Sequence, residues 1–278
     1  MKPSRPNASP PPSRSDDDLE AIYGLRAALA VFATRRDDIE RVAYTPDTRQ
    51  AASDLVRWAS QKNLPCREMS DRDLARIADT DHHEGLCLVT RPRRWLAPAD
   101  FAERLTASKG AAIALDRVRN PYNIGAILRS AAFFGIDGAL LGAPAPHPAL
   151  APGAIRVAEG GVEHLALCRT TDLVATLEQL RKRGVHIVGA ESDATANAIG
   201  YDFARPLVLV LGNEREGISP RVRAACESVV AIPGAATVES LNVSIAASLM
   251  MGEVMRESLR GRSVQPVTGS RAPSNRRS

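Results

Sequence analysis

The chain has 278 residues, of which 44% are hydrophobic and 24% charged, and its formal net charge is +4. This length allows one large domain or two modest ones with real cores, and the composition is that of a globular protein. No apolar run approaches the roughly 20 residues that span a bilayer, and the polar N-terminus lacks the layout of a signal peptide, so we expect a cytoplasmic protein. The mildly basic charge permits a nucleic-acid partner without arguing for one.

Cysteine and histidine spacing offers no metal or redox site. The four cysteines are far apart and form no CxxC pair: Cys66, Cys87, Cys168 and Cys226. Isolated cysteines of this kind are typical of small buried residues in a reducing compartment. The stretch His82-His83-Glu84 lacks the helical i, i+4 spacing of a zinc site. We therefore expect no metal.

The N-terminal third predicts a tail and then a small domain. Residues 1–18 are rich in Pro, Ser and Asp, which predicts a disordered tail. Residues 19–91 predict a small α/β domain with helices over 21–34, 48–62 and from Ser70 onward, and strands over 39–44, around Cys66 and over 86–90. The basic, proline-containing run 91–94 begins a linker predicted over 92–108, and its arginines either contact phosphates or form a solvated hinge.

Strands and helices alternate through residues 109–260, which predicts a mostly parallel sheet with helices on both faces. The expected strands are 111–116, 139–142, 163–168, 185–190, 206–211 and 229–232, and the expected helices are 124–134, 171–183 and 241–259. The run 143–152 holds four prolines and should be irregular. Residues 261–278 carry no acidic side chain and predict a disordered basic tail that favours RNA or another polyanion.

The first polar loop leads into the helix expected over 124–134. Arg129 lies almost opposite the apolar stripe of that helix, about 160° around the axis at 100° per residue. Its neighbours Gly125 and Ala126 are small, so the pattern leaves room for something to approach the helix. A solvated surface arginine is the alternative, and spacing alone leaves both interpretations open.

Two further loops follow apolar strands. In Leu211–Ser219, Gly212 and Gly217 bracket polar residues, so the backbone can bend sharply and lie close to a ligand. In the stretch 232–244, a Pro-Gly pair ends a strand and Ser240 is the expected N-cap of the next helix. Strand, loop and helix in this order often hold a ligand at the end of a parallel sheet. An ordinary turn followed by a helix cap, without any ligand, would give the same sequence pattern. Neither a G-x-G-x-x-G motif nor a P-loop is present, which argues against a nicotinamide or nucleotide enzyme.

Together, the three loops closely resemble the motifs of the SpoU (TrmH-type) family of RNA ribose 2′-O-methyltransferases in the SPOUT superfamily. The family motif Asn-x-Gly-x-x-x-Arg is matched by Asn123, Gly125 and Arg129. The motif Leu-Gly-x-Glu-x-x-Gly-Leu/Ile-Ser is matched by Leu211, Gly212, Glu214, Gly217, Ile218 and Ser219, and the third motif by Ile232, Pro233, Ser240, Leu241, Asn242, Val243 and Ser244. The resemblance covers roughly residues 111–259. Residues 21–90 more loosely resemble the small RNA-binding domain that precedes many of these enzymes.

The resemblance implies an α/β fold: a parallel-sheet SPOUT methyltransferase domain over 109–260 with a C-terminal trefoil knot, preceded by a small α/β RNA-binding domain. It implies a homodimer whose active site borrows residues across the interface and a substrate among structured RNAs, rRNA or tRNA. It also implies that the cofactor S-adenosylmethionine is bound by Leu211, Gly212, Gly217, Ile232 and Leu241.

The resemblance further implies catalytic roles for Arg129, Asn123, Glu214, Ser240 and Asn242. The family assigns Arg129 to activation of the ribose hydroxyl. Because a guanidinium with a pKa above about 12 is a poor base, we expect Arg129 to hold the target phosphate and stabilise the developing alkoxide. The other four residues would position Arg129, the cofactor or the ribose.

Two positions depart from the family pattern. Gly234 stands where the family usually has Met, and Ala236 where it usually has Gly. If the family glycine has a positive φ, Ala236 costs on the order of 1 kcal/mol in the cofactor loop. These departures motivate an alternative function, an RNA-binding paralogue with weak or no catalysis.

Overall fold

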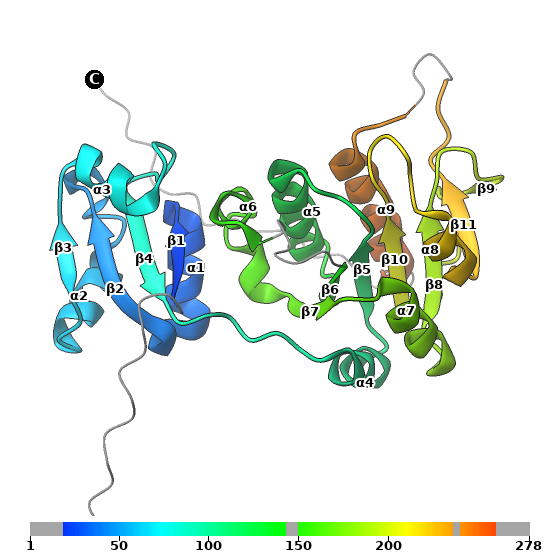
Figure 1. Ribbon diagram of the computed structural model, residues 1–278, viewed down its shortest axis with the longest axis horizontal. Coiled ribbons are helices and arrows are strands. Elements are labelled where there is room, and N and C mark those ends of the chain that lie inside the picture. Colours follow the sequence, from blue (N-terminus) through cyan, green and yellow to red (C-terminus); the bar gives the residue numbers. More distant parts are fainter. Residues whose placement is uncertain (1–18, 143–149, 236–239, 260–278) are drawn as a thin grey trace, which may run out of the picture.

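The computed structural model describes residues 19–142, 150–235 and 240–259, which form a small and a large domain, each built on its own sheet (Figure 1). Both predicted tails and Ala236 lie outside these residues. Within these three ranges, no helix combines the length and apolar character needed to cross a bilayer.

The small domain is a four-stranded sheet in the order β1-β4-β2-β3, in which β4 runs antiparallel to β1 and β2 and β3 runs parallel to β2. Its strands are β1 (Glu20–Tyr23), β2 (Ile39–Tyr44), β3 (Cys66–Glu68) and β4 (Leu86–Thr90). Its helices are α1 (Leu25–Arg35), α2 (Ser53–Gln61) and α3 (Asp71–Ala78). The cap predicted for α3 is confirmed, because the Ser70 side chain accepts from the Asp73 amide.

The helix predicted over 21–34 is wrong at its start. Ile22 continues the helical spacing of the later apolar residues, but it belongs to β1, where it pairs with Leu88 and is fully buried. Gly24, with φ of 100°, separates this strand from α1, a backbone conformation that glycine adopts at low cost. The helix predicted over 48–62 is also too long, since residues 46–48 form a 3-10 turn and α2 begins at Ser53.

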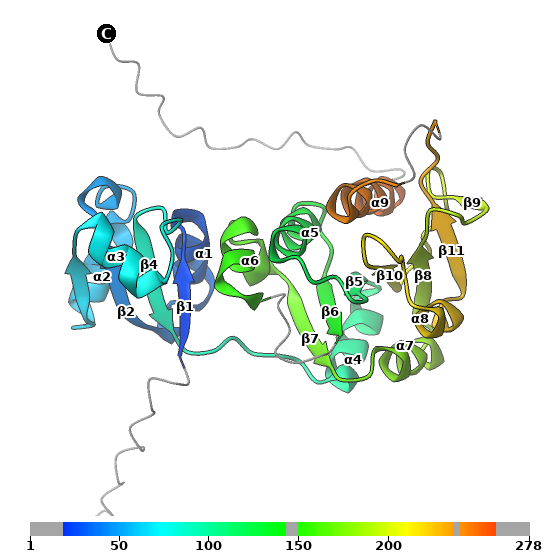
Figure 2. The same cartoon turned by 45° about the horizontal axis from the view of Figure 1, so that its top comes forward.

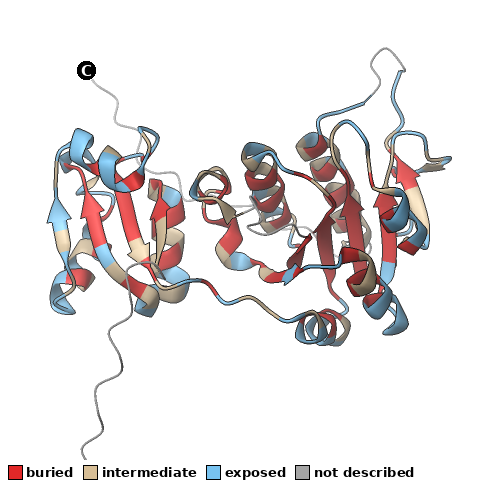
Figure 3. Cartoon of the chain, in the orientation of Figure 1, coloured by how far each residue is buried: buried red, intermediate tan, exposed pale blue. Residues whose placement is uncertain are grey.

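The large domain confirms the predicted parallel α/β sheet, with seven parallel strands in the order β7-β6-β5-β10-β8-β11-β9. The strands are β5 (Ala111–Leu115), β6 (Gly138–Gly142), β7 (Ala166–Thr170), β8 (His186–Ala190), β9 (Ala196–Asn197), β10 (Leu207–Leu211) and β11 (Ser228–Ala231). Every residue of the central strands β5 and β10 is buried, as expected for strands that helices cover on both faces (Figure 3). The trefoil knot stays a prediction.

Two groups of helices cover this sheet (Figure 2). On one face lie α5 (Pro121–Phe133) and α9 (Val243–Ser258), which share a core cluster with the sheet. The other face packs against α4 (Pro98–Ser108), α7 (Leu173–Lys182) and α8 (Pro220–Ala225). A short helix, α6 (Pro152–Val157), lies between α5 and the small domain.

The linker predicted over 92–108 needs correction, because its second half is the helix α4. Phe101 and Leu105 of α4 are each 2% exposed and belong to the core beneath the sheet. The sequence also did not predict α6 and α8, whose six residues are too few for a periodic pattern. The strand predicted over 163–168 begins instead at Ala166, after a 3-10 turn over 161–164.

We expect the packing of α4 to determine where the large domain can be separated from the small one. A fragment that begins at Trp95 keeps α4, whereas one that begins at Ser108 loses the buried Phe101 and Leu105. At about 1.5–3 kcal/mol for each buried side chain, the shorter fragment should be several kcal/mol less stable. Urea unfolding of both fragments tests this expectation, and equal transition midpoints would contradict it.

The two domains meet at a seam that has both apolar and charged contacts. Ile155 of α6 is 3% exposed and belongs to the hydrophobic core of the small domain. Beside it, the Glu163 carboxylate lies 2.9 Å from Arg35 Nε and 3.1 Å from Arg93 Nη1. These three side chains are at most 14% exposed, so removing Glu163 would leave two buried guanidinium groups with only their longer contacts to Glu20 and Asp38. Glu163 and Ile155 thus hold the small domain against the large one.

Candidate functional site

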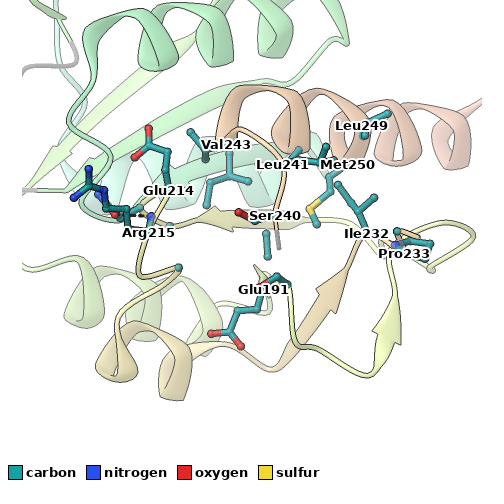
Figure 4. A pocket seen from close by; sticks show the side chains of 18 of the residues that line it. Glu191, Glu214, Arg215, Ile232, Pro233, Ser240, Leu241, Val243, Leu249 and Met250 are labelled. Carbon is teal, nitrogen blue, oxygen red and sulfur yellow. Dashed lines mark hydrogen bonds between the residues drawn. The ribbon is translucent and has the colours of Figure 1, made fainter. Parts of the chain in front are cut away.

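A pocket of about 870 Å³ opens at the carboxyl ends of three neighbouring strands, β10, β8 and β11, and is closed on one side by α9 (Figure 4). Its volume falls within the roughly 300–1,000 Å³ of small-molecule sites. The carboxyl edge of a parallel sheet is also where such folds bind their ligands. It is therefore the candidate ligand site.

The second and third sequence motifs both line this pocket. All five residues predicted to bind the cofactor are part of its wall, together with two of the predicted catalytic residues: Leu211, Gly212, Gly217, Ile232, Leu241, Glu214 and Ser240. Most of the wall is apolar, and its charged residues are Glu214, Arg215 and Glu191, the last of which pairs with Arg223 at 2.7 Å. Their assignment to a cofactor remains a prediction at this point.

The loop after β10 is shaped by its own backbone. Asn213 and Gly217 exchange two backbone hydrogen bonds of 2.9 and 3.0 Å, and Gly217 has φ of 64°. A Cβ on Gly212 would lie 2.1–2.3 Å from backbone atoms of Gly217 and Ile218. We predicted that the backbone at Gly212 lies close to a ligand, but its immediate neighbour is the returning strand of the same loop.

Side chains from the first polar loop hold this turn in place. Asp116, at the end of β5, is 6% exposed and accepts a 2.6 Å hydrogen bond from the Ser219 amide. The Asn213 side chain donates to the carbonyl of Arg117 at 3.3 Å. The sequence predicted only a strand over 111–116, which gives Asp116 no role in the site.

Three predicted catalytic residues from three separate motifs form one hydrogen-bonded chain. The Asn242 side-chain amide donates to Asn123 Oδ1 at 3.1 Å, and the Asn123 amide donates to the Glu214 carboxylate. Asn242 is also the N-cap of α9, because its side-chain oxygen accepts from the Ser244 amide at 2.8 Å. The prediction that Ser240 caps this helix is wrong, since the helix begins two residues later. Ser240 instead lies in the pocket wall.

Arg129 lies apart from the pocket of its own chain. Its side chain is 52% exposed, as predicted from its place opposite the buried stripe of α5, and its Nη1 atom lies 2.9 Å from Glu159 Oε1. The room expected at Gly125 is filled, because a Cβ there would lie 2.5 Å from the Ala154 carbonyl of α6. Gly125 thus permits helix packing rather than the approach of a ligand.

Burial of three cysteines disfavours their reactive thiolate form. All four are free thiols, and burial raises the pKa of Cys87 and Cys168 to about 11 and that of Cys226 to about 12. A thiol with such a pKa stays protonated at neutral pH, whereas the thiolate is the reactive form. In the described part of the chain, no three His, Cys, Asp or Glu side chains gather closely enough to hold a metal ion.

Part of the pocket wall was missed by sequence reasoning. It comes from the end of β8 and from α9: Ala190, Glu191, Ser192, Ala246, Leu249 and Met250. The sequence contained one indication of this part of the wall, because the strand predicted over 185–190 is followed by polar residues. Its place between β10 and β11 depends on strand order, which spacing along the chain does not reveal.

Comparison with known proteins agrees with this architecture. The sequence model of the SpoU rRNA methylase family matches residues 110–252, and that of the RNA 2′-O ribose methyltransferase substrate-binding domain matches residues 21–96. An uncharacterized tRNA/rRNA methyltransferase from Mycolicibacterium vanbaalenii is 33% identical over 254 residues, 88% of this chain and 78% of that protein.

Solved structures share the fold. The SpoU methyltransferase AviRb from Streptomyces viridochromogenes, crystallised with S-adenosylmethionine, superposes with a TM-score of 0.72 at 22% identity over 88% of this chain and 92% of that chain. An rRNA methyltransferase from Sinorhizobium meliloti superposes with a TM-score of 0.70 at 22% identity over 86% and 87% of the two chains. S-adenosylmethionine is the cofactor of this family. Because the family match spans the motifs of the pocket and a second match covers the small domain, the chain belongs to the SpoU rRNA methylase family of RNA methyltransferases.

Proposed function

We propose that this protein uses S-adenosylmethionine to methylate a ribose 2′-hydroxyl in structured RNA, either rRNA or tRNA. The observation that carries the proposal is the chain of hydrogen bonds from Asn242 through Asn123 to Glu214, which joins all three motifs at the edge of the pocket. The match of the small domain to a substrate-binding domain of RNA 2′-O ribose methyltransferases supports the ribose as target.

The pocket fits the cofactor. Apolar side chains such as Ile232, Leu241 and Met250 can enclose a purine ring, and the backbone of the loop after β10 offers polar groups along one wall. The Glu214 carboxylate lies in the same wall and can attract the positive groups of S-adenosylmethionine, whereas the Glu191 carboxylate is paired with Arg223 at 2.7 Å. Leu211, Gly212 and Gly217 complete the proposed cofactor site.

When bound, S-adenosylmethionine supplies an electrophilic methyl group, so the protein mainly has to align the ribose hydroxyl and accommodate its proton. Alignment alone can lower the barrier by up to roughly 7–11 kcal/mol. We assign Arg129 to the target phosphate and to the alkoxide that develops on the ribose, because a guanidinium stays protonated and donates up to five hydrogen bonds. The ribose proton then leaves either late in the methyl transfer or by passing to a water molecule.

We assign the remaining predicted catalytic residues to positioning Arg129, the cofactor or the ribose. Asn123 and Asn242 tie the start of α5 to the start of α9, and Glu214 extends this link to the loop after β10. Ser240 lies in the pocket wall and can contact the cofactor or the ribose. These hydrogen bonds therefore fix the position of the pocket relative to α5, the helix that carries Arg129.

A homodimer would complete this site. Arg129 does not line the pocket of its own chain, so a second copy can bring its arginine to the cofactor. Large apolar side chains are exposed on the adjoining helices α5 and α9, a sign of an interaction surface: Tyr122, Phe133, Ile245 and Leu249, each at least half exposed. We therefore assign the face of α5 and α9 to the dimer contact.

Two measurements test the function. Calorimetry should show S-adenosylmethionine binding in the micromolar range, and RNA from cells that lack the protein should have lost a ribose methyl group at a defined nucleotide. The purified protein should restore that methyl group with labelled cofactor. RNA binding without cofactor binding would instead support a catalytically inactive RNA-binding paralogue.

A further inference from the structure

Glu159 lies on a short segment that runs between a helix of each domain. It follows α6 and precedes Gly160 and Gly161. A Cβ on Gly160 would lie 2.5 Å from Ala30 Cβ of α1, and one on Gly161 would lie 3.1 Å from the Arg129 Cα of α5. The two glycines therefore let the segment pass tightly between α1 and α5, which places the Glu159 carboxylate at the domain seam.

The Glu159 carboxylate is shared between two arginines that come from different domains. Its Oε1 atom lies 2.9 Å from Arg129 Nη1, and its Oε2 atom lies 2.5 Å from Arg26 Nη1. Arg129 belongs to α5 of the large domain, and Arg26 belongs to α1 of the small domain. Each of these contacts uses one terminal nitrogen of a guanidinium, which has five N–H donors.

Exposure distinguishes this group from the contacts of Glu163 at the same seam. The side chains of Arg26, Arg129 and Glu159 are 70%, 52% and 31% exposed, so RNA can reach them. Exposed ion pairs contribute about 0–1 kcal/mol and are replaced easily. Glu163, four residues later, is 5% exposed between Arg35 and Arg93, and it is a structural contact.

We propose that the Glu159 carboxylate occupies the place of an RNA backbone phosphate between Arg26 and Arg129, and that a substrate phosphate displaces it when RNA binds across both domains. The inference rests on the proposed function, which assigns Arg129 to the target phosphate. Guanidinium groups bind carboxylate and phosphate with the same pattern of donors, so one anion can replace the other. With two arginines and one carboxylate, the group keeps a net positive charge that attracts the incoming phosphate.

Displacement makes Glu159 an internal competitor of RNA. Until RNA contacts both domains, the carboxylate occupies Arg129 and weakens the binding of polyanions that reach only one domain. The seam therefore belongs to the RNA-binding surface, with Arg26 as a phosphate contact from the small domain.

The test is Glu159→Gln in the full-length protein, with unfractionated bacterial tRNA as the probe. Loss of the competing charge should tighten tRNA binding by roughly 3- to 10-fold at moderate salt, since phosphate contacts dominate such affinities. The matched control is Glu178→Gln, which removes one exposed carboxylate from α7 on the opposite face of the sheet and should leave the affinity unchanged. In an Arg26→Ala background, the gain from Glu159→Gln should shrink, because one of the two released arginines is absent.

Other outcomes would overturn the inference. An affinity equal to that of the wild type, or a gain no larger than that of Glu178→Gln, would mean that Glu159 does not compete with RNA. Weaker tRNA binding by a Glu159→Gln protein with an unchanged melting temperature would mean that Glu159 holds the arginines in place for RNA. Failure of the proposed function would give a different result. Calorimetry would then detect no cofactor binding, whereas the tRNA affinities of the variants could still be measured and ranked.

Discussion

Arg129→Ala and Arg129→Lys should each lower methyl transfer by roughly 10²–10³-fold, which corresponds to loss of a transition-state interaction of about 3–4 kcal/mol. Lysine should not rescue the reaction, because a point-charge ammonium cannot reproduce the planar two-pronged contact of a guanidinium with phosphate. Stability should change by no more than about 0.5 kcal/mol, since the Arg129 side chain is 52% exposed. Single-turnover methylation of the true RNA, with calorimetry of cofactor binding, separates these effects.

The matched control for Arg129 is Arg181→Ala, an exposed arginine in the last turn of α7 on the other face of the sheet. It should retain the rate of the wild type. Near-normal turnover by Arg129→Ala would end the catalytic assignment and leave Arg129 as a surface residue paired with Glu159.

Gly212→Ala should abolish most cofactor binding, although alanine adds only one methyl group. Its Cβ would lie 2.1–2.3 Å from the backbone of Gly217 and Ile218, so the loop after β10 has to open. Overpacking of this kind typically costs about 1–3 kcal/mol, and loss of the pocket wall should weaken cofactor binding by roughly 10- to 100-fold. Because the clash is internal to the protein, we also expect a lower melting temperature without any ligand.

Gly234→Ala is the matched control for Gly212. Gly234 also lines the pocket, but apart from its chain neighbours a Cβ there meets no atom of the described residues within 4 Å, so the same added methyl group should be tolerated. Equal cofactor affinity for both variants would show that the loop after β10 can accommodate the added methyl group without disturbing the cofactor site.

Mixed dimers connect these two predictions. When Gly212→Ala and Arg129→Ala chains are combined, a mixed dimer holds one intact pocket and one intact arginine on different chains. If the active site is shared across the interface, as we propose, methylation should rise in the mixture above the low rate of either variant alone, measured at a cofactor concentration that leaves Gly212→Ala largely unbound. No recovery from folded, mixed dimers would mean that Arg129 does not act on the pocket of the partner chain, and it would overturn the shared site.

Local patterns in the sequence determined the order and type of most elements and the three functional loops. Buried strands such as β10 are continuous apolar runs, and a helix such as α7 repeats its apolar residues at helical spacing, so both can be recognised without their neighbours. The motif residues Leu211, Gly212 and Leu241 were predicted from the resemblance to the SpoU family motifs, before their position in the pocket wall was known.

Other features depended on contacts between distant segments. Ile22 has helical spacing but pairs in β1, and α4 lies where the basic, proline-containing run indicated a linker, because packing against a sheet outweighs local preference. The place of β8 between β10 and β11 assembles the pocket, and no spacing along the chain encodes it. Likewise, only the tertiary structure brings Arg26, Glu159 and Arg129 together, since ion pairs between residues this far apart in the sequence form only after both domains have folded.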